Sequence, residues 1–463
     1  MAVATKTLIL VSQDLQKGNK ENQHRSSWLN TLAVIAFTVS TWAALTVAGG
    51  TYMFYDRSEN PTPALEQFNE GIGYLLRFYI FLAAVACVLL VPTILSLTAK
   101  SAVLGASGRE NRLATLRLLG MSNGDITKMT MIETLRQAAI GIGIGTVLSL
   151  LTAPAWSLIS FQHQDIRTWE MILPWWGYLA VWAVIVVLAL IAAVIGLKRV
   201  LVSPLGVAKR EMPAALKWRR VIIFAVVFVG GLVYLKAYEP EASDPGSLVR
   251  VVLILMVLVG AIAVVAPMLI QLSAKIGSAV PGRVNYVASR RVAANARSTW
   301  RQVGIMVFLG IMLGYLGLSD VDQTLPGGDN TLNEDIFTGI VITFLIAIVL
   351  LMVSTALTQA ATIFETAPLT KALDYVGTAK SYHRKVAMLE MLAPTALVAI
   401  AGYVFGTLMA FVSMAGNNSP IFAERWWLSV AMLAAGVFGV AVVALIIDPL
   451  RQEIITKEVR RQT

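Results

Sequence analysis

Apolar residues along this chain gather into long stretches that are separated by short polar segments. A helix needs about 20 residues to cross roughly 30 Å of hydrocarbon, and each stretch approaches or exceeds that length. The pattern therefore predicts an all-α integral membrane protein with ten transmembrane helices. The predicted spans are 29–50, 74–98, 132–155, 174–197, 221–238, 250–272, 302–319, 337–364, 387–414 and 426–447.

The composition supports this fold class. Of the 463 residues, 57% are hydrophobic and 14% are charged, and the mean hydropathy is +0.71, which excludes a fold that water alone solvates. Cys87 is the only cysteine, so no intrachain disulfide can form. Residues 1–28 lack the apolar core and small-residue cleavage site of a secretory signal, and we expect the first span to remain as a helix.

Basic residues are distributed unequally between the two sides of the predicted membrane. If the N-terminus is cytoplasmic, most Lys and Arg residues lie inside, whereas acidic residues favour outer loops such as 319–336. The positive-inside rule therefore predicts a multi-pass protein with both termini in the cytoplasm. This sidedness accounts for the net charge of +10, so the charge implies no nucleic-acid partner. The basic residues expected outside are Arg57, Arg77, Arg167, Lys236, Arg250 and Arg425.

Segments 109–136 and 366–393 are similar to each other under one constant shift in residue number. Internal repeats of this kind in a membrane chain indicate two structural halves. Because both copies begin on the same side, the repeats are predicted to be parallel. The shift places Leu116 on Leu373, Gly120 on Gly377 and Glu133 on Glu390.

The repeat predicts the domain organisation. Two four-helix repeats flank a connecting hairpin of two transmembrane helices, and no large extracytoplasmic domain is expected because every outer loop is short. The predicted parts are a cytoplasmic N-terminal segment (1–28), the first repeat (29–205), the linker and hairpin (206–280), the second repeat (281–450) and a cytoplasmic tail (451–463).

A short amphipathic helix at the membrane surface is predicted between the second and third spans of each repeat. In the first copy, leucines recur at helical spacing beside arginines, and glycine follows as a helix terminator. One alternative is a helix that only lies among lipid head groups and has no partner. The predicted helix recurs in both halves, which favours a role as a lever on which a cytoplasmic partner acts. The residues concerned are Arg112, Leu113, Leu116, Arg117, Leu119 and Gly120, and in the second copy Leu369, Leu373, Val376 and Gly377.

The first copy resembles a known family. Glu110, Leu116-Arg117, Leu119-Gly120, Ile126 and Glu133 resemble the R-E-x-x-x-L-R-x-L-G…E signature of FtsX/MacB-like permeases of ABC transporters. This resemblance implies that 109–120 and 366–377 are coupling helices, which dock on a nucleotide-binding subunit. Ten spans in one chain resemble the bacitracin-resistance type, although this chain lacks the large extracytoplasmic domain of those permeases. The family also implies a bacterial cytoplasmic membrane.

The sequence contains no recognisable nucleotide-binding motif. No segment matches G-x-x-x-x-G-K-[ST], whose backbone and lysine hold nucleotide phosphates. We therefore expect no enzyme activity and no cofactor on this chain, and ATP and Mg on a separate ABC ATPase subunit. Two coupling helices per chain favour two copies of that ATPase. Membrane lipid is the other expected partner.

Two glutamates and three glycine pairs complete the candidate residues. Glu133 and Glu390 are predicted to lie at the mouths of the third and ninth spans, as interface anchors that pair with Lys128 and Lys385 or, less simply, as gating groups. The glycine pairs match the G-x-x-x-G motif of close helix packing. They are Gly141 with Gly145, Gly310 with Gly314, and Gly402 with Gly406.

Histidines do not suggest a metal site, because His24, His163 and His383 are far apart in the sequence. His163 is the one expected outside, where a haem-handling relative would need an axial ligand.

The favoured function is export or extraction of an amphipathic membrane-associated substrate, such as a lipid, lipopeptide or antimicrobial compound. The alternative is an ATP-driven signalling or regulatory scaffold without transport. An ion-coupled transporter would need mid-membrane carboxylates, and the predicted spans offer none.

Overall fold

The computed structural model describes residues 20–69, 75–107, 122–201, 218–237, 245–317, 331–414 and 423–459. Within these ranges the fold is helical, apart from turns and one two-stranded hairpin. The elements before that hairpin are α2 (Lys20–Glu59), α3 (Pro63–Asn69), α4 (Leu75–Ser107), α6 (Asn123–Thr152) and η1 (Ala153–Leu158). The hairpin and the elements up to the second repeat are β1 (Ser160–Phe161), β2 (Gln164–Asp165), η2 (Thr168–Met171), α7 (Trp175–Leu201), α8 (Trp218–Ala237) and α9 (Pro245–Gly277). The remaining helices are α10 (Arg283–Ala294), α11 (Ala296–Val303), α12 (Ile305–Leu316), α13 (Thr331–Tyr375), α14 (Lys380–Met414) and α15 (Ala423–Val459).

Eight helices in the described ranges are long and apolar enough to cross a membrane. They overlap predicted spans one to four, six, and eight to ten, so the all-α membrane fold is confirmed. The predicted span 221–238 lies almost entirely within α8, a helix of 20 residues. The predicted span 302–319 instead coincides with a shorter apolar helix, Ile305–Tyr315, so the prediction of a full-length span is not met there. For 302–319 the reason is local, since the polar helix α11 continues to Val303 and α12 ends at Leu316.

Contacts divide the chain into two compact units. The first comprises Met1–Gly49, Ile94–Ala155 and Ile172–Arg210; the second comprises Gly50–Thr93, Trp156–Met171 and Glu211–Thr463. Boundaries fall inside α2, α4 and η1, and they group residues by contact rather than by repeat. The predicted repeat limits stay predictions.

In the first unit, α6 packs closely against α2. A methyl group on Gly141 would collide with Phe37, and one on Gly145 would lie 2.6 Å from the carbonyl oxygen of Thr38. Phe37 is fully buried in a core that Ala138 and Ile185 share. Small residues therefore let the two helix backbones approach each other.

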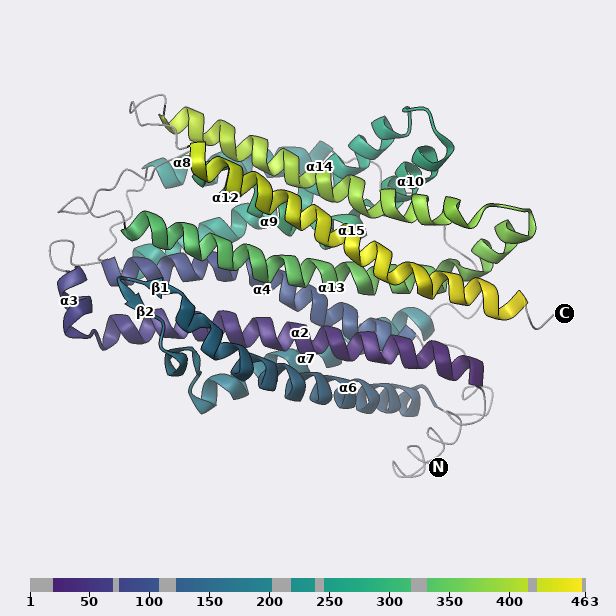
Figure 1. The fold of residues 1–463 in the computed structure, drawn as a ribbon, viewed down its shortest axis with the longest axis horizontal. Coiled ribbons are helices and arrows are strands. Elements are labelled where there is room, and N and C mark those ends of the chain that lie inside the picture. The colour runs from purple at the N-terminus through teal and green to yellow at the C-terminus, as the bar shows by residue number, and fades with distance from the viewer. Residues whose placement is uncertain are drawn as a thin grey trace. The chain divides into compact units, whose positions relative to one another are not determined.

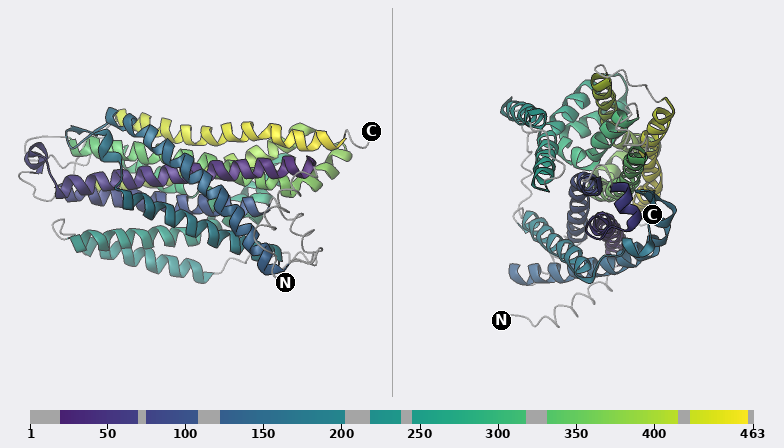
Figure 2. Two further views of the ribbon diagram at one scale, coloured as in Figure 1. Left: turned by 90° about the horizontal axis from the view of Figure 1, so that it is seen from below. Right: turned by 90° about the vertical axis from the view of Figure 1, so that its left-hand side faces the viewer.

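In the second unit, α12 and α14 meet in the same manner, and glycines lie on both helices. Side chains at Gly310 and Gly314 would strike the backbone of α14, and side chains at Gly402 and Gly406 would strike the carbonyls of Val307 and Ile311. Figure 1 shows α13, α14 and α15 alongside one another, and Figure 2 again shows α15 lying along α13. Helices α8 and α9 form a neighbouring pair.

Candidate functional site

The first predicted coupling segment lies outside the described residues. This applies to Arg112, Leu113, Leu116, Arg117, Leu119 and Gly120. The described chain leaves α4 at Ser107 and enters α6 after Ser122, whose Oγ accepts a hydrogen bond from the backbone N–H of Asp125 at 3.2 Å. This N-cap fixes the start of the helix that follows the segment.

The second predicted coupling segment is not a separate helix. Residues 366–375 are the last turns of α13, which runs unbroken from Thr331 to Tyr375. The chain contains Pro368 there, and its missing N–H removes one hydrogen bond without ending the helix. The prediction of a distinct surface helix is therefore wrong for this copy, and the segment is continuous with a membrane-spanning helix.

The end of α13 is confirmed at the predicted glycine. Gly377 has a φ of +85°, and the N–H of Thr378 donates to the carbonyl of Leu373 at 3.1 Å. This bond and the left-handed glycine form a Schellman cap, in which a residue with a Cβ would be strained.

Large apolar side chains are exposed around this cap. Leu369 is 54% exposed, Tyr375 is 71% exposed and Val376 is 84% exposed, whereas Leu373 is half-buried. The sequence pattern did not predict a role for Tyr375, because the prediction used the helical spacing of the apolar positions and Tyr375 does not fall on that spacing. An exposed apolar group of this kind at a helix end is typical of a contact surface.

The two predicted interface glutamates are both half-buried in their helices. Glu390 Oε2 lies 3.6 Å from Arg291 Nη1 on α10, so its observed ion pair joins two elements. We predicted Lys385 as the partner, but five residues along a helix correspond to about 140° of rotation, which turns the two side chains apart. The same geometry separates Lys128 from Glu133 on α6.

A buried polar network lies at the opposite end of the second unit, where α13 begins. Its centre is Arg57, which is 4% exposed near the end of α2. The guanidinium donates to the carbonyl of Phe161 at 3.1 Å and to that of Asp165 at 3.4 Å, and it binds Glu170 Oε2 at 2.6 Å. One arginine therefore holds both strands of the hairpin and η2 on α2, through charge-assisted bonds that are stronger than neutral ones.

Asp335 connects this hairpin to α13. Its Oδ2 accepts hydrogen bonds from the backbone N–H of Gln162 at 2.8 Å and from the hydroxyl of Tyr79 on α4. Thr331 Oγ1 lies 2.7 Å from His163 Nε2 and adds a second contact between α13 and the turn. Apolar packing of Leu332 against Phe161 and Met53 supports these bonds.

The turn between β1 and β2 has an unusual backbone. Gln162 and His163 both have positive φ, 58° and 59°, although neither is glycine or asparagine. Two such residues in succession match a type I′ turn, which the register Ser160 to Asp165 and Phe161 to Gln164 requires. Strain of this kind persists only where surrounding contacts fix the turn, and it concentrates at functional places. No sequence signal marked it, since the turn lacks the Asn-Gly pattern.

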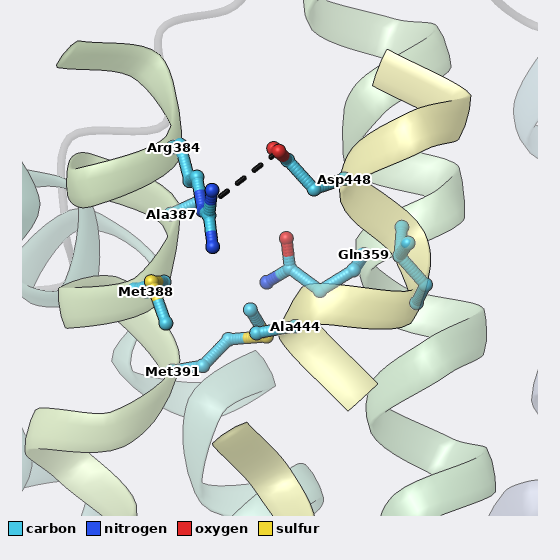
Figure 3. Close-up of a pocket in the computed structure, with 8 residues that line it drawn as sticks. Gln359, Arg384, Ala387, Met388, Met391, Ala444 and Asp448 are labelled. Carbon is cyan, nitrogen blue, oxygen red and sulfur yellow. Dashed lines mark ion pairs between the residues drawn. The ribbon is translucent and has the colours of Figure 1, made fainter. Parts of the chain in front are cut away.

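A small cavity lies between α13, α14 and α15, in the half of α13 that leads to Gly377. Figure 3 shows Gln359, Met388 and Met391 lining it, with Arg384 facing Asp448 across an ion pair of 3.8 Å. Asp448 lies just after the tenth predicted span and is followed by Pro449 and Leu450. The pair ties α15 to α14 near the point where α14 begins.

These features define an all-α, multi-pass membrane protein, whose second unit has an exposed helix cap at one end and a buried polar hairpin at the other. Residues 96–205 match the family described as FtsX-like permease C-terminal, so this part of the chain is similar to FtsX-like permeases. The matched range includes the first predicted coupling segment. No curated protein and no solved structure matches the chain.

Proposed function

We propose that this chain couples ATP hydrolysis by a separate ABC ATPase to the export or extraction of an amphipathic, membrane-associated substrate. The ATPase holds ATP and Mg, and two copies bind one permease chain, one at 109–120 and one at 366–377. The match of 96–205 to FtsX-like permeases supports the assignment. Both termini and both coupling segments then lie on the cytoplasmic side of the bacterial cytoplasmic membrane.

The observation that carries this proposal is the continuity of α13. A single helix bears the exposed residues Leu369 and Tyr375 at one end and Asp335 at the other. At 1.5 Å per residue, a helix of 45 residues has a contour of about 66 Å, which exceeds the thickness of a bilayer. A push on the cytoplasmic end therefore reaches the hairpin through covalent helix, with no intervening loop.

The polar network would hold the resting state at the outer face. A displacement of α13 along its axis relative to the hairpin and α4 must break the bonds of Asp335 to Gln162 and Tyr79, because their lengths tolerate little movement. ATP-driven motion would then open the hairpin end and give a membrane-resident molecule lateral access. The predicted spans carry no row of mid-membrane carboxylates, which favours an amphipathic substrate over a small ion.

The test is the ATPase rate of the permease purified with its ATPase. Leu369→Asp would place a charge in the proposed contact, and we expect at least a severalfold loss of coupled ATPase activity or of copurification. Ser381→Asp is the matched control, since Ser381 is also exposed just beyond the cap. Equal activity and equal copurification for the two variants would contradict the coupling assignment.

A signalling scaffold is the second candidate, and one observation favours it. The hairpin region exposes Leu158 (89%) and Trp169 (58%), with Arg167 stacked over the Trp169 ring at 5.9 Å. An aromatic and an arginine together are typical of protein contact surfaces. Such a scaffold would bind an extracytoplasmic protein in an ATP-dependent manner and would move no lipid or peptide in vesicles.

A further inference from the structure

Helices α10 and α11 carry a continuous stripe of arginines on one face. The exposed positions from 283 to 301 recur every three or four residues, so they align along the surface of the helix pair. Asn295, with φ −113° and ψ 26°, separates the two helices without moving the stripe off the surface. The exposed positions that form the stripe are Arg283, Tyr286, Arg290, Ala294, Arg297 and Arg301, and Asn295 at the junction of the two helices is exposed as well.

The opposite face holds the pair in place. Val292, Trp300 and Val303 are buried, and the helices contact α9 and α14. Asn285 Nδ2 donates to the carbonyls of Gly277 and Val280 at 2.8 and 3.1 Å, which fixes the turn that leads from α9 into α10. The arginines are therefore presented on a packed scaffold rather than on a loop.

Nothing acidic along this part of the chain neutralises the stripe. Residues 245–319 contain no Asp or Glu, and the ion pair with Glu390 involves Arg291, which does not lie on the stripe. Arg290 instead lies over the Tyr286 ring at 5.5 Å and donates from Nε to the Tyr286 hydroxyl at 3.3 Å. This contact orients one guanidinium and leaves its other nitrogens for an external anion.

The stripe ends where an apolar helix begins. Gly304 joins α11 directly to α12, whose sequence IMVFLGIMLGYL has no charge, and the buried Trp300 lies one turn before it. A basic amphipathic helix that leads into an apolar one lies at the head-group level of a membrane. There the abundant anions are lipid phosphates, which the planar guanidinium of arginine binds in bidentate fashion.

We propose that α10 and α11 form a binding surface for anionic phospholipid head groups, and that Arg283, Arg290, Arg297 and Arg301 bind the phosphates. The proposal depends on the membrane position of the chain but not on ATP coupling or on the transported substrate. If the chain does not bind anionic lipid at this surface, the proposed ATP-coupled function is unaffected. If the chain does not couple to an ATPase, the proposed lipid-binding surface is unaffected.

Native mass spectrometry of the full-length chain, titrated with phosphatidylglycerol or phosphatidylcholine, tests the surface. The wild-type chain should retain phosphatidylglycerol preferentially, and high salt should reduce the preference. Replacing Arg290, Arg297 and Arg301 with Gln should lower phosphatidylglycerol retention by about tenfold or more, because each basic residue near the membrane surface contributes separately to the electrostatic attraction of anionic lipid. Added inorganic phosphate at millimolar concentration should not compete.

A control variant carries the same change of charge elsewhere. Arg77→Gln, Arg167→Gln and Arg250→Gln together remove three exposed arginines that are predicted to lie on the outer side, and this variant should keep the lipid preference. Lysine at the three stripe positions should restore part of it, because charge returns without the bidentate geometry. Unchanged retention in the Gln variant, or an equal loss in the control, would overturn the proposal. So would a Gln variant that keeps its lipid but loses a copurifying ATPase, because the stripe would then be a protein contact.

Discussion

The carboxylate of Asp335 accepts a hydrogen bond of 2.8 Å from the backbone N–H of Gln162, in a turn whose two central residues are both left-handed. This bond joins the first turns of α13 to a strained hairpin that Arg57 also holds through its bonds to the carbonyls of Phe161 and Asp165. An N–H that points into a protein interior needs an acceptor, and here the acceptor belongs to the helix proposed to move. The strain of the turn and the anchoring of α13 thus depend on the same carboxylate.

Asp335→Asn should weaken the hairpin end. The neutral amide keeps the shape of the side chain but accepts weaker bonds from Gln162 and Tyr79, and we expect a loss of stability on the order of 1–3 kcal/mol. Thermal unfolding of the purified chain measures it. Asp165→Asn is the control, because Asp165 is exposed and contributes its backbone carbonyl to Arg57. If both variants unfold at the wild-type temperature, the carboxylate does not hold the hairpin.

The same substitution should raise the basal ATPase rate of the complex if Asp335 stabilises the resting state. The rate is measured without substrate, with wild-type and Asp165→Asn complexes side by side. A basal rate that falls in Asp335→Asn but not in Asp165→Asn would indicate that the bond is needed for the active state instead.

Arg57 and Glu170 should contribute unequally to the free energy of unfolding. Arg57→Met removes the ion pair and also the bonds to the carbonyls of Phe161 and Asp165, so it should cost about 3–5 kcal/mol. Glu170→Gln leaves those carbonyl bonds in place and should cost less. A double-mutant cycle by thermal unfolding compares the two losses of stability, and equal losses would show that the ion pair alone matters.

Gly402→Ala should destabilise the contact between α12 and α14. The added methyl group strikes the backbone of Val307, which cannot rotate away, and overpacking of this kind costs about 1–3 kcal/mol. Gly339→Ala on α13 is the control, since nothing lies within 4 Å of a Cβ at that position. There alanine should be neutral, or stabilising by up to about 1 kcal/mol through its helix propensity. Equal stability of the two variants would show that the glycines do not serve close packing.

Hydropathy predicted most of the helices because crossing hydrocarbon demands long apolar stretches. It failed for 302–319, where a polar helix occupies the start of the expected span. The helix end at Gly377 was also predictable, since glycine is the residue that tolerates a left-handed cap. The continuity of α13 was not, because a local pattern of polar residues and Pro368 gives no sign that tertiary packing extends a helix through them.

The hairpin network could not be predicted from the sequence. Arg57, Glu170, Gln162 and Asp335 are separated by many residues, and nothing in their local patterns states that they meet. Gln162 and His163 carry no turn signature, because the surrounding bonds rather than intrinsic preference impose their backbone conformation. The burial of Arg57 is evident only in the folded structure, because composition does not indicate which arginine is buried.

The most direct test of the central claim is a reversible lock at the hairpin end. His163→Cys and Thr331→Cys, combined with Cys87→Ser, place one thiol on the turn and one on α13, at two residues whose present side chains are in contact, with Nε2 and Oγ1 2.7 Å apart. If α13 carries ATP-driven motion to this end, oxidation should lower the ATPase rate of the permease–ATPase complex severalfold, and a reductant should restore it. Each single cysteine variant should be unaffected by oxidation. Full ATPase activity in a complex whose disulfide is shown by mass spectrometry to be formed would contradict the account.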